Sequence, residues 1–149
     1  MSSGRPVLYS IGYEGFATAD GLCDALERAG VERVVDVRDL PRSRRPGFSR
    51  RALEAALAGA GIVYEHRREL GNPAAIRAVY RSGDRDGGRT AYRAHLLGDR
   101  SSALGGLAEA ALERPTAMLC LEDDQAACHR DVIAEELVRR HPEIRIERL

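Results

Sequence analysis

Short runs of apolar residues alternate along the chain with segments in which apolar residues recur at helical spacing. The runs at residues 7–13, 32–38 and 62–66 predict buried strands. The run at 116–121 is the most apolar, and 144–149 predicts a short last strand. Apolar runs that are continuous rather than alternating are typical of strands covered on both faces, so the pattern predicts a mainly parallel sheet of about five strands.

Helices are predicted between these strands. The segments with helical spacing are 18–29, 49–60, 102–113 and a last one that ends at Arg140. Thr18 and Ser49 precede the first two as N-caps, and Cys23 falls on the apolar pattern of the first, which predicts a core position. Residues 70–101 are interrupted by a glycine-rich stretch and predict an excursion from the sheet that could act as a lid.

Strands separated by helices predict a single Rossmann-like α/β domain over residues 1–149, with helices on both faces of the sheet. In such sheets ligands bind beyond the carboxyl ends of the strands, where the strand order reverses. Polar residues that directly follow the strands are therefore the first candidates for function.

Composition narrows the class of protein. The 149 residues are 44% hydrophobic and 31% charged, which favours a globular domain over a disordered chain. The formal net charge is zero, unlike that of a strongly basic nucleic-acid-binding domain, although all 23 basic residues are arginines. The chain has three cysteines, so we expect no structural disulfides. It has no apolar run long enough to span a bilayer and no signal-peptide pattern, so we expect a cytoplasmic protein without membrane attachment.

Three carboxylates lie at or just after predicted strands that should be neighbours: Glu14, Asp36 and Glu122. Carboxylates gathered in one crevice need cationic partners, a metal, or a raised pKa that allows acid–base catalysis. Arg38 lies two residues after Asp36 on the same face of the strand, so the two form either a structural ion pair or a pair that presents the guanidinium to a ligand.

The sharpest constellation combines thiols with a basic pair. Cys120 and Glu122 share a face at a strand end, eight residues before Cys128, His129 and Arg130. With Asp124 as the cap of the last helix, Cys128 would lie in or near its first turn, where a thiolate is stabilised. Each sulfur is interpreted either as a core residue or as a nucleophile. The ligand types suit zinc, but the paired C-x-x-C spacing is missing, so no metal is expected.

Aromatic and basic residues near the strand ends favour a nucleotide-like ligand. Tyr13 and Tyr64 could stack on a base, and the arginines of residues 42–45 could hold phosphates. The sequence has neither G-x-G-x-x-G nor a Walker lysine, which argues against the familiar dinucleotide and nucleoside-triphosphate sites. No cofactor is expected.

Taken in order, these motifs resemble the domain of unknown function 488 family over almost the whole chain. The residues that carry the resemblance are Ile11-Gly12-Tyr13, Asp36-Val37-Arg38, Pro41, Ser43, Tyr64, His66, Leu70-Gly71, Cys120-Leu121-Glu122 and Cys128-His129-Arg130. The resemblance implies a compact Rossmann-like domain with these motifs around one pocket, and it implies no established reaction. The ligand-binding residues expected there are Tyr13, Arg38, Ser43, Tyr64, His66, Cys120, Cys128 and Arg130.

The leading hypothesis from the sequence is an enzyme that acts on a nucleotide or nucleic acid by carboxylate-assisted water attack, in particular at an N-glycosidic bond as in DNA repair. Its candidate catalytic residues are Asp36, Glu122, Glu14 and His129. Two other hypotheses stay open. One is a thiol enzyme with Cys120 or Cys128 as nucleophile and His129 as base. The other is a noncatalytic sensor of an anionic or phosphorylated ligand.

Overall fold

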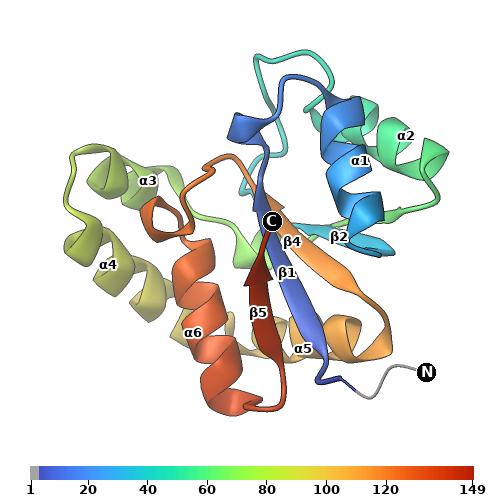
Figure 1. Ribbon diagram of the computed structural model, residues 1–149. Helices are drawn as coiled ribbons and strands as arrows, with labels where there is room; N and C mark the ends of the chain where they lie inside the picture. The colour runs from blue at the N-terminus through green and yellow to red at the C-terminus, as the bar shows by residue number, and fades with distance from the viewer. Residues whose placement is uncertain (1–3) are drawn as a thin grey trace.

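One parallel sheet organises the molecule in the computed structural model, which describes residues 4–149 (Figure 1). The strands are β1 (Val7–Gly12), β2 (Arg33–Asp36), β3 (Val63–His66), β4 (Thr116–Cys120) and β5 (Arg145–Arg148). They pair in the order β3-β2-β4-β1-β5, and every pairing is parallel. The predicted parallel α/β sheet is confirmed.

Six α-helices connect or flank these strands in the described residues. They are α1 (Ala19–Arg28), α2 (Arg50–Gly59), α3 (Ala74–Arg81), α4 (Arg85–Leu97), α5 (Ser101–Glu113) and α6 (Arg130–Arg140). Within residues 4–149 no helix has the length and apolar character needed to cross a membrane.

Helices cover both faces of the sheet because alternate strand residues point to opposite sides. Val34 and Leu119 pack with α1 and α2 in one core, which also contains Cys23. Val35 and Met118 pack with α4, α5 and α6 in the other. The chain leaves β1 through α1 toward β2 and leaves β4 through α6 toward β5, so the direction of winding reverses between β1 and β4.

The helix starts differ in part from those predicted. The Thr18 hydroxyl accepts a hydrogen bond from the Gly21 amide at 3.1 Å and caps α1 as expected. The Asp124 prediction is wrong: its carboxylate caps the short 3₁₀ helix Gln125–Ala127, accepting from the Ala126 amide at 3.0 Å. Because this extra turn intervenes, α6 begins at Arg130, and Cys128 lies just before the helix.

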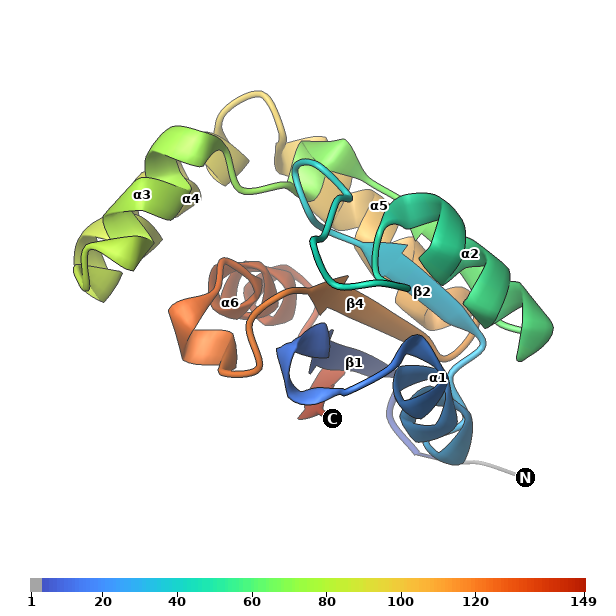
Figure 2. The ribbon, with the colours of Figure 1, turned by 90° about the horizontal axis from the view of Figure 1, so that it is seen from above.

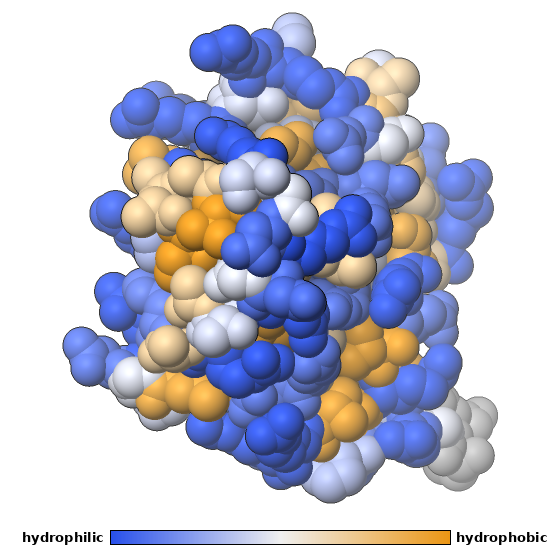
Figure 3. Space-filling view, turned by 90° about the vertical axis from the view of Figure 1, so that its left-hand side faces the viewer, coloured by the Kyte–Doolittle hydropathy of each residue, from blue (hydrophilic) through white to orange (hydrophobic). Residues whose placement is uncertain are grey.

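Helices α3 and α4 form the predicted excursion from the sheet (Figure 2). Arg89 of α4 pairs with Asp131 and Glu135 of α6, and Arg93 pairs with Glu135 at 2.8 Å. The face that carries α3, α4 and α6 is largely hydrophilic, with hydrophobic patches between the charged groups (Figure 3). These ion pairs hold the excursion against the start of α6, next to the carboxyl ends of the strands.

Candidate functional site

A pocket of about 470 Å³ lies at the carboxyl ends of β1, β2 and β4, where the direction of winding reverses. The segment before α6 and helix α3 both contribute residues to its walls. The residues that line the pocket are Tyr13, Arg38, Asp39, Leu40, Arg42, Asn72, Arg77, Tyr80, Arg81, Cys120, Leu121, Glu122, Ala127, Cys128 and His129. Its place follows the rule for open parallel sheets.

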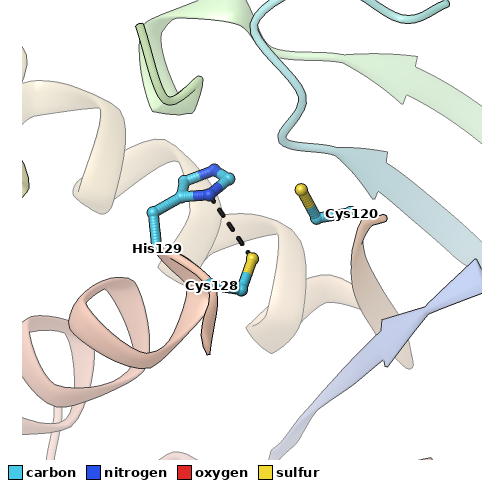
Figure 4. Close-up of side chains that lie close together, drawn as sticks. All are labelled: Cys120, Cys128 and His129. Atoms are coloured by element: carbon cyan, nitrogen blue, oxygen red, sulfur yellow. Dashed lines mark hydrogen bonds between the residues drawn. The ribbon is translucent and has the colours of Figure 1, made fainter. Parts of the chain in front are cut away.

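Two thiols and an imidazole meet at this pocket (Figure 4). Cys120 comes from the end of β4, while Cys128 and His129 come from the turn that leads into α6. The two sulfur atoms and a ring nitrogen of His129 all lie within 4.8 Å of one another. The Cys128 Sγ lies 3.5 Å from His129 Nδ1. All three cysteines of the chain are free thiols.

Arg130 supplies a positive charge beneath this cluster. Its side chain is fully buried and donates to Ser10 Oγ at 2.9 Å, to the Glu122 carbonyl and to Cys128 Sγ at 3.4 Å. Within residues 4–149 no carboxylate lies within ion-pair distance of the guanidinium. A buried charge requires a partner of opposite charge. Among the contacts of Arg130, only the Cys128 sulfur can provide one, as a thiolate.

The two sulfurs therefore differ in ionisation. Burial opposes ionisation of Cys128, but a hydrogen bond from Cys120 and the positive charges of His129 and Arg130 outweigh it and lower the pKa of Cys128 well below that of an ordinary thiol. Donating that hydrogen bond to Cys128, together with burial, raises the pKa of Cys120. The surroundings therefore favour the thiolate at Cys128 and the protonated thiol at Cys120.

Two neighbours complete the cluster. His129 Nε2 lies 2.8 Å from the Val37 carbonyl oxygen, which is hydrogen-bond distance. This nitrogen therefore carries a proton, and Nδ1 faces the Cys128 sulfur. Glu122 is partly buried, and its Oε1 lies 3.6 Å from Cys120 Sγ. Burial and the nearby Cys128 charge raise the pKa of Glu122, which favours the protonated carboxyl and suits an acid.

Glycine at position 12 explains how Glu122 reaches the pocket. A Cβ at Gly12 would lie 1.7 Å from the Glu122 carbonyl oxygen, so only glycine lets the end of β1 approach this backbone. Gly12 therefore allows two segments of the chain to approach each other closely.

Asp36 and Arg38 form an ion pair, as both interpretations of their spacing require. Arg38 donates to Asp36 from Nε at 2.9 Å and from Nη2 at 2.6 Å, and Tyr64 donates to the same carboxylate at 2.5 Å. Asp36 is completely buried and does not line the pocket. Arg38 lines it, but its Nη1 is also bonded to the Phe48 carbonyl at 2.7 Å.

The remaining predicted residues lie at the same end of the sheet but outside the lining. Exposed Glu14 accepts a hydrogen bond from the Asp123 amide at 3.2 Å. His66 Nε2 lies 2.7 Å from the Arg38 carbonyl oxygen. The Ser43 backbone is hydrogen-bonded to the Ser49 hydroxyl in the loop before α2. Of the twelve residues predicted from the sequence, those that line the pocket are Tyr13, Arg38, Cys120, Glu122, Cys128 and His129.

The structure adds residues that sequence reasoning missed, and four of them come from the excursion at 70–101. Asn72, Arg77, Tyr80 and Arg81 line the pocket. The Asn72 Oδ1 and the Tyr80 hydroxyl are buried without a hydrogen-bond partner in the described chain. Such atoms are normally paired, so they offer polar contacts to a ligand. The one sequence signal for these residues is the helical spacing of Arg77, Tyr80 and Arg81, which indicates that they share a helix face.

Comparison with known proteins assigns the family. The family model described as "Domain of unknown function DUF488" matches residues 18–137. The chain belongs to the DUF488 family. No curated protein and no solved structure matches it. The matched part of this DUF488 chain includes the pocket lining from Arg38 to His129, and Tyr13 lies before it.

Proposed function

We propose that this DUF488 protein is a thiol-dependent enzyme in which Cys128 is the nucleophile toward an anionic substrate. The observation that supports this most directly is the buried Arg130 guanidinium, whose only contact within residues 4–149 able to carry a negative charge is the Cys128 sulfur. A thiolate at the edge of a pocket is the reactive form of cysteine.

The residues around Cys128 suit a two-step displacement. The thiolate forms a bond to the electrophilic atom of the substrate, and the leaving group departs with the electron pair of the broken bond and takes the proton of Glu122. Water then attacks the same atom, gives its proton back to Glu122 and releases the sulfur as thiolate. Both groups line the pocket.

The arginines favour an anionic substrate. Arg38, Arg42, Arg77 and Arg81 line the pocket. The side chains of Arg38 and Arg77 form hydrogen bonds and ion pairs with other residues of the protein. The side chains of Arg42 and Arg81 have no hydrogen bond or ion pair within residues 4–149. Two guanidinium groups without partners, one from the loop after β2 and one from α3, can bind a carboxylate or phosphate.

A second candidate is Glu122-assisted hydrolysis of a nucleotide or nucleic acid, including base release at an N-glycosidic bond. The tyrosine rings of Tyr13 and Tyr80 line the same pocket as the arginines, which suits a base and its phosphate. Asp36 is enclosed and Glu14 lies outside the lining, so Glu122 would be the acid in this reaction. Cys128→Ser separates the two candidates, because only the thiol reaction requires the sulfur.

Alkylation rates test the proposed function before any substrate is known. Reduced protein is treated with iodoacetamide or iodoacetate between pH 6 and 8, and each cysteine is quantified by peptide mass spectrometry. We expect Cys128 to react at pH 6 nearly as fast as at pH 8, whereas an ordinary thiol slows by about 100-fold over that range. Relative to a free thiol, the anionic reagent should be favoured at Cys128 because of the arginines.

Cys23 provides the matched control, since it is a buried free thiol in α1 and lies outside the pocket lining. Cys128 alkylation that falls with pH as steeply as that of a free thiol would contradict the thiolate. Tight anion binding with no nucleophilic reactivity would favour the sensor.

A further inference from the structure

We infer that Cys120, Cys128 and His129 form a binding site for a soft divalent cation of the Zn²⁺ type, open to the pocket. The inference concerns a site that the proposed thiol chemistry does not require. It stands on the arrangement of the three ligand atoms, on the hydrogen bond behind His129 and on the open side of the cluster.

The ligand atoms already have the spacing of a metal site. Zinc binds thiolate sulfur at about 2.3 Å and imidazole nitrogen at about 2.0–2.1 Å, so tetrahedral geometry puts the two ligand atoms about 3.6 Å apart. Cys128 Sγ and His129 Nδ1 are 3.5 Å apart, and Cys120 Sγ lies within 4.8 Å of both. A cation can enter with small side-chain movements.

His129 is held as a metal ligand usually is. Its Nε2 faces the Val37 carbonyl at 2.8 Å, so in the neutral ring the proton is on Nε2 and the lone pair of Nδ1 faces the sulfurs. A backbone carbonyl on the far ring nitrogen is the common arrangement behind a ligating histidine. The ring also packs against Tyr92 in a T-shaped arrangement, with 4.9 Å between centroids, which limits its rotation.

The fourth position of the site faces the pocket. Cys120, Cys128 and His129 all line it, and Glu122 Oε1 lies 3.6 Å from Cys120 Sγ at its rim. Three protein ligands with one open position is the composition of catalytic rather than structural zinc sites. The open position can take water, the anionic group of a substrate, or the Glu122 carboxylate after it turns.

Cobalt binding tests this inference on the full chain. Reduced, chelator-treated protein is titrated with Co²⁺ under argon, and the thiolate-to-cobalt absorption in the near ultraviolet and the visible bands of tetrahedral cobalt are recorded. We expect one Co²⁺ per chain, displaced by one Zn²⁺. Cys120→Ser, Cys128→Ser and His129→Gln should each weaken binding by at least 10-fold.

Cys23→Ser is the matched control and should bind as the unsubstituted protein does, with folding of every variant checked by circular dichroism. Absence of the thiolate-to-cobalt band in folded protein, or binding that survives Cys128→Ser unchanged, would overturn the site. The alkylation test of the proposed function is run with chelator present, so its outcome is separate from that of metal binding. Bound Zn²⁺ should protect Cys128 from alkylation, because the metal occupies the same lone pair.

Discussion

Two buried ionic groups lie side by side at the carboxyl end of the sheet, and they differ in which atom carries the negative charge. At Asp36 the charge is on a carboxylate that receives hydrogen bonds from Arg38 and Tyr64 and is completely buried. At Cys128 the charge that we propose is on a sulfur that contacts Arg130 at 3.4 Å and lines the pocket. Enclosed charge with full hydrogen bonding stabilises the fold, whereas the same kind of charge on a sulfur that borders a pocket is available for chemistry.

The comparison predicts the largest effect on stability at Asp36. Asp36→Asn leaves the Arg38 guanidinium buried without its anion, which should cost about 3–5 kcal/mol of unfolding free energy. Urea unfolding followed by circular dichroism measures this loss. In the fraction that stays folded, Cys128 alkylation at pH 6 should be unchanged, and a selective loss of that reactivity would show that the two groups are not separate.

Arg130 should act mainly on reactivity. Arg130→Met keeps a long apolar side chain but removes the cation beside Cys128, so the pKa of the thiol should rise and alkylation at pH 6 should fall on the order of 10- to 100-fold. Because a charge replaced by an apolar group of similar length leaves no unpaired ion, the stability loss should be smaller than for Asp36→Asn. Unchanged alkylation would remove the main support for the proposed function.

His129 is the second positive influence that lowers the pKa of Cys128. His129→Gln removes the ring that faces the sulfur at 3.5 Å, and we expect alkylation of Cys128 at pH 6 to fall by roughly 10-fold. The rate of Cys128 alkylation is measured by quenching the reaction at set times and quantifying the modified peptide by mass spectrometry. A loss equal to that of Arg130→Met would mean that the imidazole and the guanidinium contribute equally.

The smallest expected effect is a pH-dependent gain in the unfolding free energy of the variant Glu122→Gln. Burial raises the pKa of this carboxyl in the folded protein, so unfolding releases a proton and stability falls as pH rises from the ordinary value of the carboxyl through the folded one. Glu122→Gln should therefore be more stable than the unsubstituted protein at neutral pH and nearly equal to it near pH 4. Thermal unfolding at the two pH values checks the sign, which would be reversed if the carboxylate were favoured in the fold.

Sequence patterns alone determined the sheet, its parallel sense and the end at which the pocket lies. The continuous apolar runs reflect strands such as β4, whose five residues are all buried, and burial on both faces requires helices on both sides. The strand-end rule then located Cys120, Glu122 and Arg38 correctly at the pocket, because it depends only on the direction of each strand. Cys23 was found in the core for a similar reason, since helical spacing reports which face is buried.

Tertiary structure alone decided the partners of each polar atom. Nothing in the spacing of Asp36 indicates that Tyr64 from the next strand closes over its carboxylate, or that Arg130 and Ser10 meet beneath Cys128. Nor does the chain order show that α3 completes the pocket wall. Periodicity reports burial, which a residue inherits from its own strand or helix, whereas hydrogen bonds and ion pairs at this site join residues as far apart as 120 positions. Their partners are set by the strand order and by the packing of α6 against it.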